Sequence, residues 1–158
     1  MLDELCPQVV VTYGPDGGYG HPDHVRAYQV TMAAAAQVPA VARVFWAVRP
    51  RSAVDAGIEA VRGMAGLPFT APDPGGLPAV ADEEITTVLD VGAQVQTTMR
   101  AIRAHRTQVR LWEGGGGDRA FALADGVARP VPGCEYFILA SGTSPDAEGD
   151  LFAGLPLP

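Results

Sequence analysis

Apolar residues along the chain follow two patterns, namely short runs rich in β-branched residues and longer stretches with helical spacing. Residues 8–13 (QVVVTY) and 43–48 (RVFWAV) are compact runs typical of buried strands, which are apolar on both faces. Between them, residues 22–38 repeat apolar side chains at helical intervals. Pro22 suits the first position of a helix and Pro39 ends the pattern, so this stretch predicts a strand–helix–strand unit.

The rest of the chain continues to alternate between predicted helices and predicted strands. Residues 53–64 predict a helix with Ser52 as its N-cap, and residues 92–108 predict the clearest amphipathic helix. A Pro/Gly-rich loop is expected at 66–78, and strands are expected at 85–91 and 135–140. Strands that alternate with helices predict a layered α/β fold. The length of 158 residues suits a single domain spanning residues 1–158, with a tail from about residue 142 that we expect to be flexible.

Net charge, the length of apolar runs and cysteine content argue against several classes of partner and site. The chain carries 11 basic and 18 acidic residues, for a formal net charge of −7. Nucleic acids and anionic membranes attract clustered positive charge, so we expect neither as a partner. Apolar runs are too short to span a membrane and no signal peptide is visible, which predicts a cytoplasmic protein. Cys6 and Cys134 are too few for a disulfide framework or a cysteine-based metal site.

The side chains best suited to catalysis or metal binding are concentrated in residues 12–24 (TYGPDGGYGHPDH). This segment spans a predicted strand end, a glycine-rich loop and a predicted helix start. In open α/β sheets, ligands bind at the carboxyl ends of strands. His21 and His24 are three residues apart and can share one helix face, while Asp23 can orient a neighbouring histidine. The phenol of Tyr19 can polarise a carbonyl oxygen. This composition suits a metal or acid–base site, although a histidine at a helix start also serves as a cap or a solvated side chain.

Histidines alone cannot complete a zinc site in this chain. Zinc sites in proteins normally use at least three protein ligands. The only histidine outside the cluster of His21 and His24 is His105. Residues 12–24 therefore predict at most part of a metal site.

Three stretches resemble one enzyme family. Residues 17–24 (GGYGHPDH), after the strand at 9–13, resemble the second signature of the LmbE/PIG-L-type zinc-dependent N-deacetylases. The resemblance is closest to the mycothiol-pathway members that act on N-acetylglucosaminyl-inositol. Residues 104–108 (AHRTQ) resemble a late helical pattern of the family, and residues 135–137 resemble its closing strand. Gly20 favours the deacetylases over the related mycothiol S-conjugate amidases.

The resemblance implies a role for each residue of the cluster. His24 would be a zinc ligand, and His21 would be the general acid or the stabiliser of the oxyanion. Asp23 would hydrogen-bond to His21 and tune it, and Tyr19 would help to polarise the amide carbonyl. Gln108 would contact the sugar. The implied reaction is zinc-dependent hydrolysis of an N-acetyl group, with an amino-sugar inositol as the substrate.

The chain departs from the family pattern at one point. The family has an N-terminal His-Pro-Asp-Asp-Glu motif that supplies two further zinc ligands and the general base, and this sequence has no such motif. We therefore expect the C-terminal part of a deacetylase domain, with a missing N-terminal half as its partner. The resemblance implies a Rossmann-like layered fold with a mostly parallel sheet, without the family's N-terminal strands. Alternatives are a catalytically inactive fragment, a module that binds a sugar or protein, and an S-conjugate amidase.

Overall fold

The computed structural model describes residues 1–143 and 149–156 and divides the chain into two compact units. The first unit comprises residues 1–50, 78–89 and 135–158, and the second comprises residues 51–77 and 90–134. Both contain helices and strands, which confirms the α/β character predicted from the sequence. No helix within the described residues is long and apolar enough to cross a membrane.

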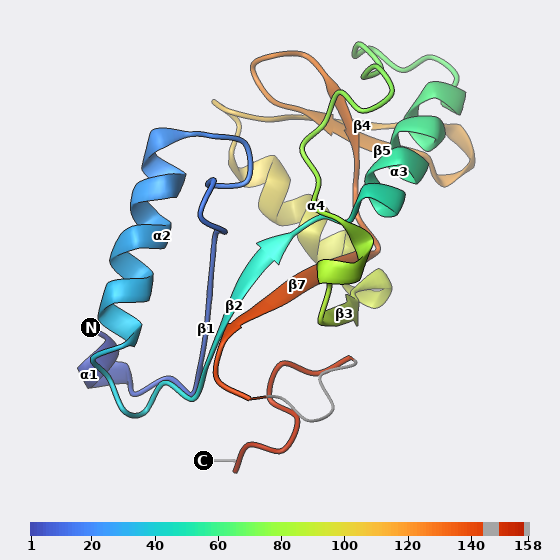
Figure 1. Cartoon of the computed structure of the whole chain (residues 1–158). Helices are drawn as coiled ribbons and strands as arrows, with labels where there is room; N and C mark the ends of the chain where they lie inside the picture. Colours follow the sequence, from blue (N-terminus) through green and yellow to red (C-terminus); the bar gives the residue numbers. More distant parts are fainter. Residues whose placement is uncertain (144–148, 157–158) are drawn as a thin grey trace. The chain divides into compact units, whose positions relative to one another are not determined.

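The first unit is built on a four-stranded sheet (Figure 1). Its strands are ordered β1 (Val9–Thr12), β2 (Arg43–Val48), β7 (Cys134–Ser141) and β3 (Thr87–Asp90). Strands β1 and β2 are parallel and are joined by α2 (Pro22–Ala35), as the strand–helix–strand pattern predicts. Strand β7 is antiparallel to β2. Between β2 and β7 the chain forms the whole second unit and strand β3. The sheet is therefore of mixed orientation rather than mostly parallel.

The core of this unit lies on β2 and β7. Phe45 is completely buried and meets the ring of Phe137 edge-on, with ring centroids 6.3 Å apart. Val44 and Thr87 are also buried, as is Ala35 of α2. By contrast, β1 occupies an edge of the sheet, and the side chain of Val11 is 47% exposed. The unit also contains the short helices α1 (Leu2–Leu5) and η1 (Asp82–Glu84).

A buried arginine joins the start of β2 to the C-terminal segment. Arg43 is 2% exposed and donates to three main-chain oxygens. Its Nε contacts the Thr143 oxygen at 2.7 Å, its Nη1 the Leu151 oxygen at 3.0 Å, and its Nη2 the Ala153 oxygen at 2.6 Å. These bonds hold residues 149–156 against β2. Of the tail expected to be flexible from about residue 142, residues 144–148 and 157–158 lie outside the described residues, and its mobility stays a prediction.

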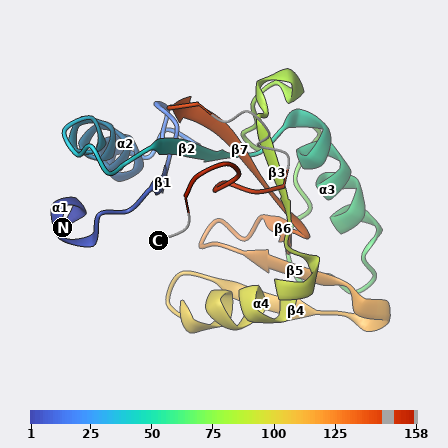
Figure 2. The ribbon, with the colours of Figure 1, turned by 90° about the horizontal axis from the view of Figure 1, so that it is seen from below.

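The second unit contains a three-stranded antiparallel sheet in the order β4 (Arg110–Glu113), β5 (Arg119–Ala122), β6 (Ala128–Pro130). Helix α3 (Arg51–Gly63) packs on β6, and α4 (Val95–Ala104) contacts β4 (Figure 2). Val61 of α3 forms the buried core with Ala120 and Ala128. Two short 3-10 helices, η2 (Gly92–Gln94) and η3 (Gly115–Gly117), complete the unit.

Two helix boundaries in this unit differ from the prediction in ways that affect named residues. Helix α3 begins at Arg51, so Ser52 is inside the helix rather than its N-cap. Helix α4 ends at Ala104, with His105 as its C-cap, whereas the sequence predicted a helix to residue 108. Gln108 instead closes a turn, its N–H donating to the carbonyl of His105 at 2.9 Å.

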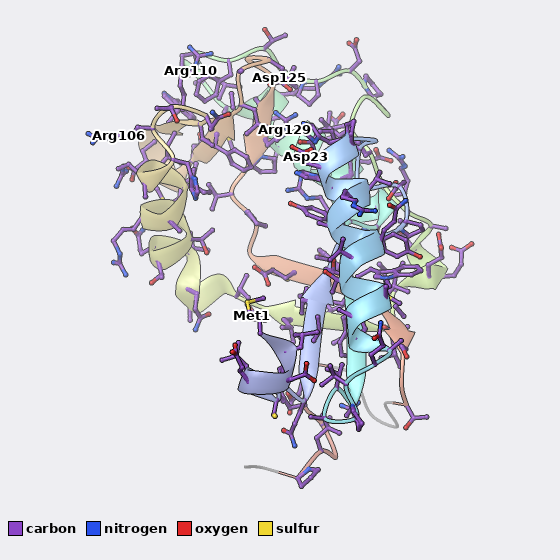
Figure 3. All side chains as sticks on the ribbon, turned by 90° about the vertical axis from the view of Figure 1, so that its left-hand side faces the viewer. Met1, Asp23, Arg106, Arg110, Asp125 and Arg129 are labelled. Atoms are coloured by element: carbon purple, nitrogen blue, oxygen red, sulfur yellow. The ribbon has the colours of Figure 1, made fainter. Side chains whose placement is uncertain are left out.

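The hairpin between β5 and β6 is closed by an ion pair. Asp125 and Arg129, labelled in Figure 3, meet through Arg129 Nη2 and Asp125 Oδ2 at 2.8 Å. The other carboxylate oxygen, Oδ1, accepts from the Val127 N–H at 3.0 Å. The hydrogen bond from Arg129 is the main cause that holds the pKa of Asp125 below its ordinary value, against a smaller opposing effect of burial. The pair therefore stabilises the turn only while Asp125 is ionised.

Replacing the buried arginine tests its contribution to stability. Arg43→Met is expected to lower the free energy of unfolding by about 3 kcal/mol, because three charge-assisted hydrogen bonds are lost. Arg26→Met, at an exposed position of α2, should change it by less than about 0.5 kcal/mol. Urea unfolding followed by circular dichroism measures both. Equal effects of the two substitutions would contradict the role given to Arg43.

The Asp125–Arg129 pair predicts a pH-dependent contribution to stability. A lowered folded-state pKa means that the stabilisation is complete above the ordinary aspartate pKa and is lost as the pH falls through the folded value. Because the Asp125 side chain is 44% exposed, Asp125→Asn should cost less than about 1 kcal/mol at pH 7. That difference from the unchanged chain should shrink below about pH 4. Urea unfolding at pH 7 and pH 3, with Glu59→Gln as the exposed control, would show whether the difference instead persists in acid.

Candidate functional site

The candidate site occupies the connection between β1 and α2 in the first unit. Strand β1 ends at Thr12 and α2 begins at Pro22, so residues 13–21 form the loop between the carboxyl end of a strand and the start of a helix. His21 is the N-cap of α2, and Pro22 holds the first helical position, where a missing N–H costs nothing. Figure 3 shows Asp23 at this end of the helix. Residues 12–24 thus span a strand end, a loop and a helix start, as the sequence predicts.

Main-chain hydrogen bonds within the loop fix its shape. The Gly17 N–H donates to the Gly14 carbonyl, and the Gly20 N–H donates to the Asp16 carbonyl, each at 2.9 Å. Asp16 Oδ1 accepts from the Gly18 N–H at 2.9 Å. Gly17 has a φ of 68°, in the left-handed region that glycine adopts without strain. The loop is therefore shaped by its own residues.

Four aromatic and imidazole rings gather at this loop. The rings of His21 and His24 have centroids 5.0 Å apart. Tyr19 meets His24 edge-on at 5.0 Å and His21 at 5.9 Å. Tyr13 stacks on His24 at 4.0 Å with an interplanar angle of only 8°. The two histidines share one face, as their spacing predicts, and Tyr19 completes a compact group with them.

The main chain assigns a tautomer to His24. Its Nδ1 lies 3.1 Å from the carbonyl oxygen of Gly17. A carbonyl oxygen can only accept, so Nδ1 carries the proton and a neutral ring has its lone pair at Nε2. Histidines that ligate metals through one nitrogen commonly donate the other N–H to a backbone carbonyl. The half-buried His24 is therefore in the tautomer of a ligand that binds through Nε2.

The main chain assigns the opposite tautomer to His21. The N–H of Asp23 donates to His21 Nδ1 at 3.2 Å, which is the N-cap bond of α2. Nδ1 is the acceptor here, so a neutral ring carries its proton on Nε2. His21 is exposed. It can therefore present an N–H donor to a bound molecule, whereas His24 presents a lone pair.

The other predicted site residues are Asp23, Tyr19 and Gln108. Asp23 contacts His21 through its main-chain N–H, and its side chain is exposed. Tyr19 is 57% exposed, so its phenol is accessible. Gln108 is exposed in the second unit, whereas the residues of the ring group all lie in the first.

The donor set does not fit a zinc ion by itself. Among the described residues, no group of three or more His, Cys, Asp or Glu side chains could hold a metal ion. Zinc sites need three or four protein ligands, and the ring group offers one imidazole lone pair with a defined direction, at His24. The described part of the chain can thus contribute to a metal centre but cannot form one alone.

Sequence reasoning missed Tyr13 and Gly17 as parts of the site. Tyr13 looked like the last residue of a strand, but it stacks on His24, eleven positions later. Gly17 looked like one of several loop glycines, but its carbonyl holds His24. The available signal was an aromatic residue at the end of a strand just before a glycine-rich loop with histidines.

Comparison with known proteins identifies relatives of the whole chain. Each of the following is named 1D-myo-inositol 2-acetamido-2-deoxy-alpha-D-glucopyranoside deacetylase. One from Saccharopolyspora erythraea, numbered 1, is 52% identical over 159 residues, covering 98% of this chain and 52% of the relative. One from Actinosynnema mirum is 48% identical over 155 residues, covering 98% and 55%. One from Saccharomonospora viridis is 44% identical over 155 residues, covering 98% and 56%.

The alignments cover nearly all of this chain but only part of each relative. The chain spans about half the length of the curated relatives it matches. A scan against protein-family models finds no match. Identities of 44–52% over 98% of the chain nevertheless establish common descent. The chain is therefore a homologue, over nearly its whole length, of the 1D-myo-inositol 2-acetamido-2-deoxy-alpha-D-glucopyranoside deacetylases, which confirms the resemblance expected from residues 17–24.

Proposed function

We propose that this chain provides one half of the active site of an enzyme that hydrolyses the N-acetyl group of an N-acetylglucosaminyl-inositol. The observation that carries the proposal is the pairing of His21 and His24 in opposite tautomers, with ring centroids 5.0 Å apart. One ring offers a hydrogen-bond donor and its neighbour offers a lone pair. The names of the relatives indicate the substrate and the deacetylation.

The other half of the site would come from a segment outside this chain. A metal centre built with His24 needs further ligands, and an amide hydrolase needs a base for the attacking water. Zn²⁺ is the metal that the family resemblance implies. When bound, such a cation supplies polarisation of the acetyl carbonyl and activation of water. The parallel β1–α2–β2 unit supports a Rossmann-like layout, in which further strands extend the sheet beyond the edge strand β1.

His21 is best suited to stabilise the oxyanion. Attack of water on the acetyl carbon places negative charge on the former carbonyl oxygen, and the neutral His21 ring can donate its Nε2–H to that oxygen. A protonated ring could serve as a general acid, but it would lose the N-cap bond that Nδ1 accepts from Asp23. The cap therefore favours oxyanion stabilisation over proton donation. Tyr19, within reach of both rings, would donate its phenolic O–H to the same oxygen before attack.

Zinc titration of the isolated chain tests the proposed share of the metal centre. With one ligand in place, the chain should bind Zn²⁺ more weakly than micromolar, because water must fill the other positions. His24→Ala should remove most of that weak binding, while the exposed control Gln29→Ala should leave it unchanged. Isothermal titration calorimetry provides the measurement. Submicromolar binding of one ion per chain would show that this chain has a ligand set of its own.

A chimera tests the catalytic roles. In it, this chain replaces the matching region of the Saccharopolyspora erythraea deacetylase, and acetate release and bound metal are measured together. His21→Ala should lower kcat by about 100-fold or more with the metal retained, as expected for the loss of an oxyanion donor. His24→Ala should lower the metal content. Metal loss in His21→Ala with metal retained in His24→Ala would mean that the two roles are exchanged, and equal metal loss in both variants would contradict the division of roles.

The same chimera separates the competing functions. Release of acetate from N-acetylglucosaminyl-inositol supports the deacetylase, with Gln29→Ala again as the control for a change on α2. Faster cleavage of a mycothiol S-conjugate would support the related amidase. A folded chimera that acts on neither substrate, while the parent enzyme is active, would support a binding module or a catalytically inactive chain.

A further inference from the structure

His24 is contacted on several sides by residues with no assigned role in the reaction. The face of its imidazole stacks on the ring of Tyr13, with centroids 4.0 Å apart and planes 8° from parallel. Its Nδ1 edge is held 3.1 Å from the Gly17 carbonyl. Among the described hydrogen bonds none reaches Nε2. The ring is thus restrained in a way that leaves only this nitrogen without a protein partner.

Gly17 fits closely against the residue that it holds. A Cβ atom at this position would lie 2.8 Å from the Val25 nitrogen and 2.9 Å from the His24 Cβ. The φ of 68° is also unfavourable for any residue with a side chain. The carbonyl can therefore approach Nδ1 in this geometry because position 17 has no side chain.

The stack and the hydrogen bond restrain different motions of the imidazole. The carbonyl of Gly17 distinguishes Nδ1 from the carbon on the opposite side of the ring, but one hydrogen bond still allows the ring to tilt. The near-parallel Tyr13 ring opposes tilt, because stacked aromatic rings lose contact when their planes separate. Tyr19, almost perpendicular at 85°, bounds the imidazole in another direction.

We propose that Tyr13 is a positioning residue that, together with the Gly17 carbonyl, fixes the plane and tautomer of His24 so that the Nε2 lone pair is presented to a cation. The use of that lone pair rests on the proposed function, whereas the restraint on the ring does not. Tyr13 acts through the face of its ring rather than through its hydroxyl group. Tyr13→Phe should therefore preserve the effect, and an aliphatic side chain should remove it.

The test reads the tautomer of His24 directly in the metal-free chain. With ¹⁵N-labelled histidine at a pH where imidazoles are neutral, long-range ¹H–¹⁵N spectra distinguish a protonated from an unprotonated ring nitrogen. The chain has only three histidines, so single His→Ala variants assign the signals. The unchanged chain and Tyr13→Phe should show His24 protonated at Nδ1. Tyr13→Leu should raise the Nε2-protonated fraction about fivefold, as expected for loss of one aromatic pair.

Controls separate this effect from general loss of structure. Phe152→Leu removes another exposed aromatic ring and should leave the His24 spectrum unchanged. If Tyr13→Leu does not fold by circular dichroism, Tyr13→Met takes its place, because the longer and more flexible methionine side chain adapts to the space that the ring leaves. An unaltered tautomer in a folded aliphatic variant would overturn the proposal.

Zinc titration of the same variants distinguishes failure of this inference from failure of the proposed function. If Tyr13→Leu changes the tautomer while His24→Ala leaves zinc binding unaltered, the ring restraint is real and the proposed metal role is wrong. If His24→Ala abolishes zinc binding while Tyr13→Leu does not change the tautomer, the metal role stands and Tyr13 is not a positioning residue.

Discussion

The carbonyl group of Gly17 is the constraint on which the candidate site depends. It accepts the Nδ1–H of His24 and so decides which nitrogen of that ring retains a lone pair. Its direction depends on a left-handed backbone conformation, and the Gly14 and Asp16 hydrogen bonds hold the surrounding loop. The second histidine is governed by the same kind of contact with opposite polarity, because a main-chain N–H points at its Nδ1. Two identical side chains thereby acquire complementary chemistry from the backbone alone.

Local patterns explain which elements the sequence could predict. The β1–α2–β2 unit follows from two β-branched runs and from proline residues at 22 and 39, and all of these signals act over a few residues. The antiparallel sheet of the second unit was missed because its strands are short and each combines apolar residues with an arginine. Their burial depends on a non-local partner, α3, which covers Ala120 and Ala128. The antiparallel orientation of β7 is likewise a property of its pairing with β2, which is distant in the sequence, and its own residues do not reveal it.

The same distinction between local sequence patterns and non-local contacts applies to the candidate site. The spacing of His21 and His24 predicted that the two rings would be neighbours, and they are. Which nitrogen each ring presents could not be predicted, because it depends on the directions of one carbonyl and one N–H. The stack of Tyr13 on His24 joins a strand end to a helix across a loop, so helical or strand periodicity cannot reveal it. The sequence therefore indicated where the reactive side chains lie, whereas main-chain geometry determines which nitrogen each histidine presents.

If this loop forms the proposed half of an active site, its internal order has a consequence for the assembly of that site. Ordering a flexible loop at the moment of binding subtracts from the free energy of association, since side chains and backbone lose conformational freedom. Here the hydrogen bonds within residues 14–20, the N-cap of α2 and the Tyr13 stack set the ring positions without any other segment. A complementary segment would then need to supply ligands in the right direction, but it would not need to order this loop. The stability of the loop and the affinity for the complementary segment would therefore be linked through the same few hydrogen bonds.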